Sequence, residues 1–119
     1  MKQTCPVYTT MNFMGKKWTT LILLEMYKGN TKWKRYSQIK NSLMDITPKV
    51  LSMRLRELEK EGLVKHRVES GNFPLKSKYR LSDSGEDFVK VIKGVKKWGL
   101  RWKVRNKHCE SMNCKECDF

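Results

Sequence analysis

Four cysteines are the residues of this sequence whose type and spacing are best suited to chemistry. Cys109, Cys114 and Cys117 follow a C-x4-C-x2-C pattern close to the C-terminal end, and Cys5 lies near the start of the chain. Clustered thiols with a fourth donor form a common set of metal ligands, and this spacing also occurs among the ligands of iron–sulfur clusters. We therefore treat the four cysteines as a candidate metal or redox site.

Three interpretations of this site stay open on the residues alone. In the first, Cys5, Cys109, Cys114 and Cys117 hold a metal group, with a 4Fe-4S cluster as the first choice and zinc as the second. In the second, the thiols form reversible disulfides, either Cys5 with a cysteine near the C-terminal end or Cys114 with Cys117. In the third, all four are inert free thiols.

The charged side chains indicate a polyanionic partner. The chain of 119 residues has 26 Lys and Arg against 12 Asp and Glu, which gives a net charge of +14. A surface of this sign attracts nucleic acids. The excess lies in residues 31–80, with thirteen basic and five acidic side chains, and in residues 88–107, with eight basic and no acidic ones. On charge alone, nucleic acid and anionic membrane are the natural partners and acidic small molecules come third. The elements described next favour double-stranded DNA.

The first basic block lies on two predicted helices separated by a short turn. Apolar spacing predicts a helix over 34–43 that turns Tyr36 and Ile39 inward. The next helix begins at Thr47, a typical N-cap, followed by Pro48 at the first helical position. It runs over about 48–61, with leucines on one side and basic residues on the other, and a glycine ends it.

After this helix the period of the sequence changes from 3.6 to 2. Residues 64–69 place charged side chains between Val64, His66 and Val68, which predicts a strand with one basic face. A turn region over 70–77 and a returning strand over 78–81 complete a basic hairpin.

Three further helices are predicted around this unit. A short one runs from Pro6 to Gly15, a second and largely buried one from Lys17 to Tyr27, and a long final one begins after Ser82. The apolar stripe of the final helix is Phe88, Val91 or Ile92, Val95, Trp98 and Trp102. A small core cannot bury all of these, so the stripe indicates an interface between chains; the alternative is a helix folded back on its own domain.

The order of helix, short helix, capped helix and basic hairpin is that of a winged helix-turn-helix. We therefore predict a mainly α domain with a small β-hairpin (α+β) over residues 1–107, followed by a cysteine-rich tail over residues 108–119. A helix fits the major groove, where its first residues reach base edges, while hairpin cations contact phosphates. The predicted DNA-binding residues are Lys34, Arg35, Thr47, Lys49, Ser52, Met53, Arg54, Arg56, Lys65, Arg67, Lys76 and Lys78.

Several segments also resemble a known family. These are Cys5-Pro6-Val7, the run from Gly15 to Leu23, the run from Ile46 to Val64, the run from Tyr79 to Gly85, and Lys97-Trp98-Gly99. Together they resemble the HxlR-type transcriptional regulators, a branch of the MarR-like winged helices. The resemblance covers about residues 5–102, and the tail departs from the family pattern.

The resemblance implies a homodimeric DNA-binding regulator whose N-terminal and C-terminal helices form the dimer interface. The interface residues would be Val7, Met11, Val95, Trp98 and Trp102. It also implies that Cys5 occupies the position at which several members of the family sense thiol oxidation or electrophiles. If the first and last helices pack together, Cys5 approaches the tail of its own or of the partner chain, and a change there would alter the spacing of the two recognition helices.

Two other function classes are weighed against this one. A constitutive architectural or RNA-binding protein would use charge alone, with a steep salt dependence and little discrimination between sequences. An enzyme is not indicated, because the chain has two histidines and no nucleophile motif or glycine-rich phosphate loop. No apolar run approaches the roughly 20 residues of a membrane span, so we expect a cytoplasmic protein without a membrane partner.

Overall fold

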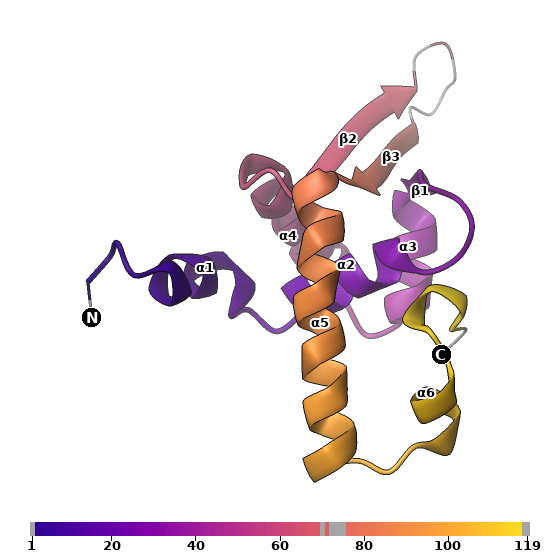
Figure 1. Cartoon of the computed structure of the whole chain (residues 1–119). Coiled ribbons are helices and arrows are strands. Elements are labelled where there is room, and N and C mark those ends of the chain that lie inside the picture. The colour runs from indigo at the N-terminus through magenta and orange to yellow at the C-terminus, as the bar shows by residue number, and fades with distance from the viewer. Residues whose placement is uncertain (1, 70, 72–75, 118–119) are drawn as a thin grey trace.

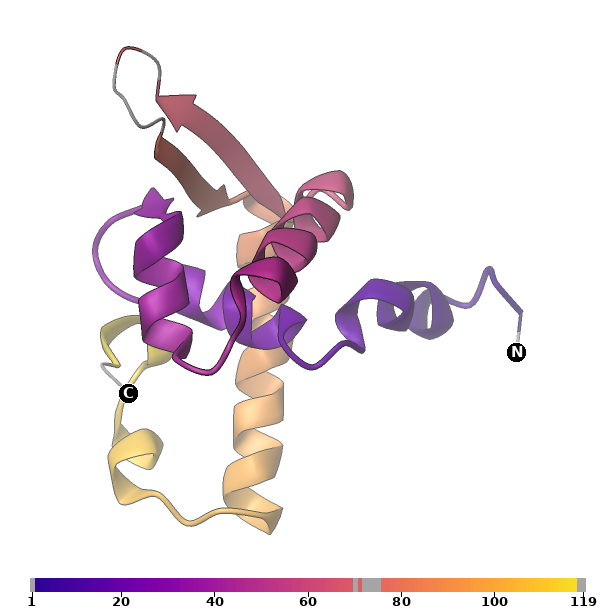
Figure 2. The same ribbon diagram turned by 180° about the vertical axis from the view of Figure 1, so that it is seen from behind.

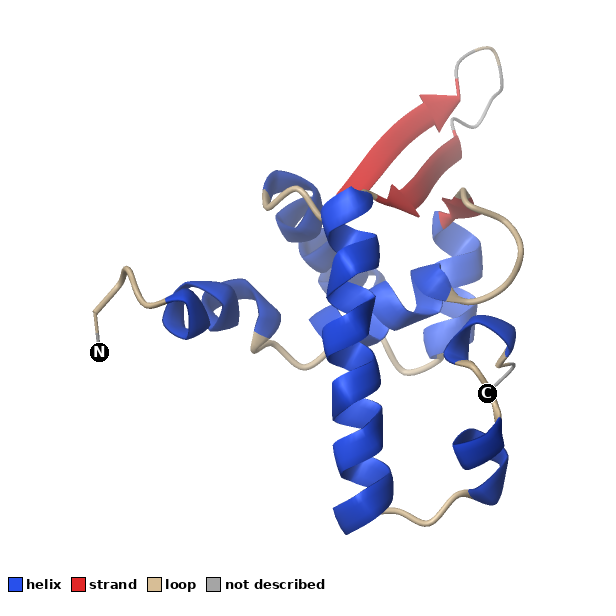
Figure 3. Cartoon of the chain, viewed as in Figure 1, coloured by secondary structure: helices blue, strands red, loops and turns tan. Residues whose placement is uncertain are grey.

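A computed structural model describes residues 2–69, 71 and 76–117 of the chain (Figure 1). Its elements are, in order, α1 (Pro6–Met14), α2 (Thr19–Tyr27), β1 (Lys34–Arg35), α3 (Tyr36–Leu43), α4 (Pro48–Lys60), β2 (Val64–Glu69), β3 (Lys76–Leu81), α5 (Asp83–Trp102), α6 (Lys107–Ser111) and the 3-10 turn η1 (Cys114–Glu116). Helices dominate the described part of the chain, with one small sheet at one end (Figure 3). This confirms the predicted fold class.

The core gathers around α2, which runs through the middle of the domain. Ile22 and Leu23 of α2 are fully buried, together with Ile39 of α3 and Leu51 and Leu58 of α4. These side chains lie on one face of each helix, as the apolar spacing of α3 and α4 predicts. The prediction for α2 was less accurate, because this helix begins at Thr19, two residues later than expected.

Local signals set both ends of α4. The hydroxyl oxygen of Thr47 accepts a hydrogen bond from the amide of Val50 at 3.2 Å, and Pro48 occupies the first helical position. After the helix, Gly62 adopts a φ of +86°, a left-handed conformation that favours glycine. The Leu63 amide then donates to the Leu58 carbonyl at 2.9 Å, which closes the last turn. The predicted start and end of this helix are confirmed.

The sheet has the strand order β1-β3-β2, with antiparallel pairing throughout. The prediction of a helix beginning at Lys34 was wrong, because Lys34 and Arg35 pair with β3 and the helix begins only at Tyr36. The Arg35 amide donates to the side-chain oxygen of Gln38 at 2.9 Å, which caps this later start. The returning strand begins at residue 76 rather than 78, and residues 70 and 72–75 of the predicted turn lie outside the described residues.

Helix α5 is joined to the wing by a compact corner. The Ser82 hydroxyl oxygen accepts from the Gly85 amide at 3.2 Å, and the same hydroxyl donates to the Gly62 carbonyl. The first half of α5 is packed against the domain through Val89 and Ile92, both buried. The second half extends beyond the core (Figure 1).

Helix α1 and the C-terminal segment lie on opposite sides of α5, as two opposite views show (Figures 1 and 2). Helix α1 stands away from the domain as an arm, whereas the C-terminal segment turns back towards α2 and α3. The radius of gyration is 15.3 Å, compared with about 13.5 Å for a compact domain of this length. None of the helices in the described part of the chain is long and apolar enough to cross a membrane.

Candidate nucleic-acid interface

The outer face of α4 carries the predicted base-reading residues. Thr47, Lys49 and Arg56 are exposed, and Met53 between them is half-buried. They lie on the side of the helix opposite its buried leucines, because positions three and four apart share one face. The structure therefore brings these four residues together on one surface.

Tyr36 connects α3 to the start of α4. Its hydroxyl donates to the Pro48 carbonyl at 3.0 Å and lies 3.3 Å from the Ser52 hydroxyl. The predicted contact residue Ser52 is half-buried and already has this neighbour. From the sequence, Tyr36 was assigned only to the core, but its hydroxyl also contacts the first turn and a half of α4, where the predicted base-reading residues begin.

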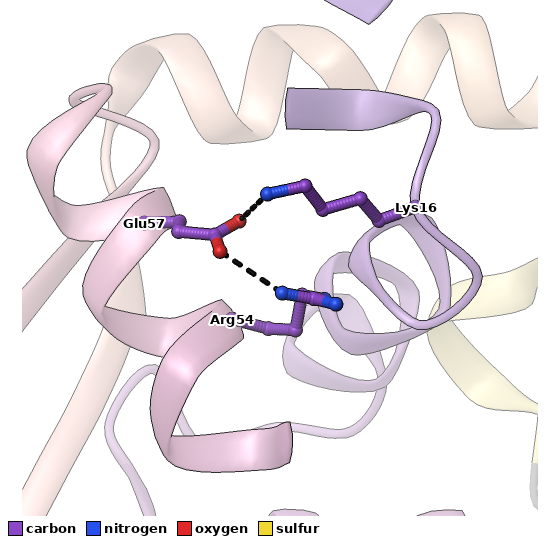
Figure 4. Close-up of polar contacts among 3 residues, drawn as sticks. All are labelled: Lys16, Arg54 and Glu57. Atoms are coloured by element: carbon purple, nitrogen blue, oxygen red, sulfur yellow. Dashed lines mark hydrogen bonds and ion pairs between the residues drawn. The ribbon is translucent and has the colours of Figure 1, made fainter. Parts of the chain in front are cut away.

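Arg54 lies on a different face from the predicted groove residues. Its Nη1 is 2.9 Å from Oε1 of Glu57, and Oε2 of the same carboxylate is 2.9 Å from Nζ of Lys16 (Figure 4). The Arg54 side chain is only 17% exposed. The prediction of Arg54 as a DNA contact does not fit this position, because its guanidinium helps to tie α4 to the segment that follows α1.

The same contacts predict a pH-dependent effect of Glu57→Gln. The hydrogen bond from Lys16, with a smaller contribution from Arg54, holds the pKa of Glu57 below its usual value. A depressed carboxyl pKa stabilises the fold above the unfolded value of about 4.3, and this contribution is lost as the pH falls through the folded pKa. We expect the variant to lose about 1 kcal/mol of unfolding free energy at neutral pH.

Urea unfolding of wild type and Glu57→Gln at about pH 7 and about pH 3 measures this effect. The two curves should separate at neutral pH and converge in acid, where the wild-type carboxyl is protonated. An equal difference at both pH values would show that the side-chain amide itself, rather than the lost charge, causes the effect.

Cations form a row across the outer face of the sheet. The register places Arg35 and Arg67 on either side of Lys78, one from each strand. Side chains two residues apart on a strand share a face, so Lys65 and Lys76 lie on this side as well. The five predicted DNA contacts on the sheet therefore lie on one surface: Arg35, Lys65, Arg67, Lys76 and Lys78.

Lys78 is partly neutralised within this row. Its ammonium pairs with the Glu69 carboxylate at 2.5 Å, and the hydrogen bond that it donates is the largest cause of the lowered pKa of Glu69. The exposed cations Arg35, Lys65, Arg67 and Lys76 carry the positive surface of this face.

Trp33 is a member of this surface that the sequence reasoning missed. The guanidinium of Arg67 lies 4.4 Å from the centroid of its ring and that of Arg80 lies 5.7 Å away. Stacking of this kind restricts the arginine side chains. A tryptophan directly before a basic pair is visible in the sequence, but its partners lie more than thirty residues away along the chain.

Lys34 does not join the cationic row. It pairs with Tyr79, on the core side of the sheet, and its Nζ donates to the Glu25 carbonyl oxygen. Burial lowers the pKa of Lys34, opposed by Glu25 and reinforced by Lys115 and Lys28. The prediction of Lys34 as a DNA contact does not fit this position, because the strand turns its side chain inward.

The predicted interface residues are all exposed in the single chain. Val95, Trp98 and Trp102 of α5 are 60%, 56% and 63% exposed, and Val7 and Met11 of α1 are 64% and 48% exposed. Val91 extends the α5 stripe, whereas Ile92 belongs to the core. The stripe is therefore not covered by the described part of its own domain, which was the alternative interpretation.

The cysteines do not converge within one chain. Helix α1, which begins directly after Cys5, lies on the opposite side of α5 from the C-terminal segment (Figures 1 and 2). All four cysteines are half-buried free thiols. No group of three or more His, Cys, Asp or Glu able to hold a metal is found among residues 2–69, 71 and 76–117. The four-cysteine cluster or zinc site therefore does not fit one chain, and only the partner-chain form of that prediction remains.

A family model described as HxlR-like helix-turn-helix matches residues 13–107. The HTH-type transcriptional regulator YdzF of Bacillus subtilis strain 168 is 40% identical over 95 residues, which cover 80% of this chain and 84% of YdzF. YdeP of the same strain is 35% identical over 101 residues, which cover 85% of this chain and 76% of YdeP. These relatives are described as transcriptional regulators and not as enzymes.

Solved structures share the fold. A MarR-family transcriptional regulator from Porphyromonas gingivalis W83 superposes with a TM-score of 0.76 at 28% identity, covering 86% of this chain and 96% of that one. The oxidised redox regulator HypR has a TM-score of 0.71 at 30% identity, covering 84% and 99%. The reduced regulator YodB of B. subtilis has a TM-score of 0.70 at 27% identity, covering 87% and 99%. The chain thus belongs to the HxlR-like helix-turn-helix family.

Proposed function

We propose that two copies of this chain form a transcriptional regulator that reads double-stranded DNA with α4 in the major groove. The proposal rests on the presence of two surfaces in one domain. One is the outer face of α4, which carries Lys49 and Arg56. The other is the cationic row of Arg35, Lys65 and Arg67 on the sheet, which forms the wing. In such an arrangement the helix supplies sequence preference and the wing cations supply affinity for phosphates.

Arg56 provides the sharpest test of the reading helix. A preferred duplex is first selected from random-sequence DNA with the wild-type protein, and binding to it is compared with binding to bulk duplex DNA. Arg56→Ala should weaken binding to the selected duplex by about 10- to 100-fold, because a bidentate arginine–guanine contact contributes about 1–3 kcal/mol.

Arg56→Lys is the matched control, since it keeps the charge and removes the planar fork. It should retain the affinity for bulk DNA and the salt dependence but lose most of the preference for the selected duplex. Equal binding of wild type and Arg56→Ala to the selected duplex would remove α4 as the reading element. Failure to select any preferred duplex would favour the charge-only nucleic-acid-binding alternative.

We also propose that the regulator responds to thiol oxidation through Cys5 and the cysteines of the C-terminal segment. Two observations support this proposal: the cysteines are free and half-buried, and the similar structures include HypR, described as a redox regulator, and YodB in its reduced form. Because Cys5 is the N-cap residue of α1 and this helix lies on the far side of α5 from the C-terminal segment, the pairing of Cys5 with that segment would join two chains. We favour a response to oxidation over a response to a bound metal. Metal analysis of anaerobically purified protein tests this choice, and it should find neither iron nor zinc.

A further inference from the structure

The C-terminal segment is docked onto the domain at two points. The Gly29 amide, just after α2, donates to the Lys115 carbonyl in η1 at 2.8 Å. On the other side, Nζ of Lys96 in α5 donates to the Met112 carbonyl at 2.7 Å. The segment that departs from the family pattern is therefore an ordered part of this fold, held between α2 and α5.

Tyr27 links the same three elements. Nζ of Lys115 lies 4.9 Å from the centroid of its ring, and Nζ of Lys93 in α5 lies 5.2 Å from it. Lys93 also donates to the Tyr27 hydroxyl at 3.2 Å. Lys115 thus docks η1 through both its carbonyl and its ammonium group, and it stands between Cys114 and Cys117 in the sequence.

The turn that contains these two cysteines is closed by local hydrogen bonds. The side-chain oxygen of Asn113 accepts from the Lys115 amide at 3.0 Å, and the Cys117 amide donates to the Cys114 carbonyl at 3.2 Å. Residues i and i+3 of such a turn have Cα atoms less than about 7 Å apart. Disulfides span Cα separations of about 4.4–6.8 Å. The hydrogen bond between the two residues therefore keeps their Cα atoms close to the separation that a disulfide spans.

The surroundings of the turn are electropositive and partly open. Cys117 lines a surface pocket together with Lys28, Lys34 and Glu25, so two cations face one carboxylate there. Lys115 adds a third cation, which lies close enough to Lys34 to lower the pKa of that ammonium group, behind the larger effect of burial and against the opposing effect of Glu25. Partly exposed, electropositive sites are where reactive cysteines are found in proteins. The same pocket includes Met44, at the turn between α3 and α4.

We propose that Cys114 and Cys117 are a redox modification site at which peroxide forms an intrachain disulfide. One thiolate attacks a peroxide oxygen, the O–O bond breaks, and a sulfenic acid and water result. The second thiolate displaces the hydroxyl from this sulfur, forming the S–S bond and a second water. In total, two thiols give up two electrons and two protons to one hydrogen peroxide, which becomes two water molecules.

This reaction uses neither Cys5 nor DNA, and it leaves Cys109 as the partner for the interchain pairing of Cys5. It joins two sulfurs of one docked turn, so it neither requires nor produces a covalent dimer. Because the disulfide closes a turn that is already formed, the segment should stay docked. Exchange of the Gly29 amide hydrogen, which reports on its bond to Lys115, should then be at least fivefold slower in the oxidised protein.

Tryptic mapping tests the pairing directly. Trypsin cleaves after Lys107 and Lys115, which places Cys109 and Cys114 in residues 108–115 and Cys117 in residues 116–119. In full-length Cys109→Ser protein treated with hydrogen peroxide and then alkylated, the two fragments should be recovered as one disulfide-linked species. Cys5→Ser should leave this species unchanged, whereas Cys114→Ser and Cys117→Ser should each abolish it.

A second measurement tests whether the folded turn promotes the disulfide, or whether the two cysteines pair only because they are three residues apart in the sequence. In a glutathione redox titration, the pair should have an effective thiol concentration at least fivefold higher in the native protein than in the same protein in urea. Unlinked fragments from the natively folded Cys109→Ser protein would overturn the proposal. So would equal values with and without urea, or a Cys117 linked only between chains.

Discussion

Gly85→Ala is expected to lower the free energy of unfolding by about 3 kcal/mol. A Cβ atom built on Gly85 would lie 2.2 Å from the Leu63 carbonyl oxygen and 3.2 Å from Cδ2 of Leu81. Real Cβ contacts are never this short, and the atom in the way is backbone. Overpacking this severe should lower the free energy of unfolding by an amount at the upper end of the usual range of about 1–3 kcal/mol.

The surrounding hydrogen bonds prevent an easy relaxation. The Leu63 carbonyl accepts from the Ser82 amide at 2.9 Å, and the Ser82 hydroxyl accepts from the Gly85 amide and donates to the Gly62 carbonyl. A shift that made room for the new methyl group would stretch the bonds that cap α5. The corner that joins wing and α5 therefore needs glycine for close approach.

Gly94→Ala is the matched control in the same helix. A Cβ atom at Gly94 would have no neighbour within 4 Å, and alanine in a helix interior is favoured over glycine by about 0.5–1 kcal/mol. This variant should be more stable than wild type. Urea unfolding of all three proteins at one protein concentration measures the difference. A Gly85→Ala protein within 1 kcal/mol of wild type would contradict the close approach.

Features fixed by local signals were predictable, and α4 is the clearest case. Thr47, Pro48 and the glycine at position 62 act through bonds within a few residues, and the structure has this helix where they place it. Strand β1 was missed because its two residues pair with β3, more than forty residues further along the chain. No local pattern distinguishes such a strand from the start of a helix.

Periodicity alone also could not predict which apolar residues of α5 are buried and which are exposed. Val89 and Ile92 face the core, while Val91, Val95 and Trp98 are exposed. Both sets recur at helical spacing and lie on adjacent faces, so the sequence shows one broad apolar surface. Packing against α2 and β3 decides which part is covered.

Long-range contacts also limited how well the candidate site could be predicted from the sequence. The sequence shows Arg54 as one more cation on α4, but its role depends on Glu57 and on Lys16, which is 41 residues from Glu57. Lys34 was misplaced because a strand, not a helix, turns it inward. The docking of the C-terminal segment rests in part on backbone carbonyls, which leave no signal in residue types.

Trp98→Gln is expected to raise the dissociation constant of the proposed dimer by about 30- to 1000-fold. The exposed residues Val91, Val95, Trp98 and Trp102 follow one line along α5, about 17 Å long at 1.5 Å per residue. Buried aromatic anchors at the centre of an interface typically contribute about 2–4 kcal/mol when they are truncated. Trp98 lies within this line and is the first candidate for such an anchor.

Lys97→Gln provides a matched control, because it introduces the same side chain one position away, on the basic face of α5. It should change the dissociation constant by less than about threefold, since a single exposed charge contributes little. Sedimentation over a range of protein concentrations measures both variants. Circular dichroism should show the fold unchanged in each, because Trp98 is 56% exposed in the single chain and contributes little to its core.

Loss of the dimer should carry over to DNA. In the proposed dimer, two recognition helices would bind half-sites about 34 Å apart, one helical turn of the duplex. A monomer keeps the contacts of one α4 helix and one wing, so at a protein concentration where wild type is dimeric, Trp98→Gln should lose most of its binding to the selected duplex. Binding should return as the protein concentration is raised above the new dissociation constant. A dimer of unchanged strength in Trp98→Gln would mean that the α5 stripe lies outside the interface.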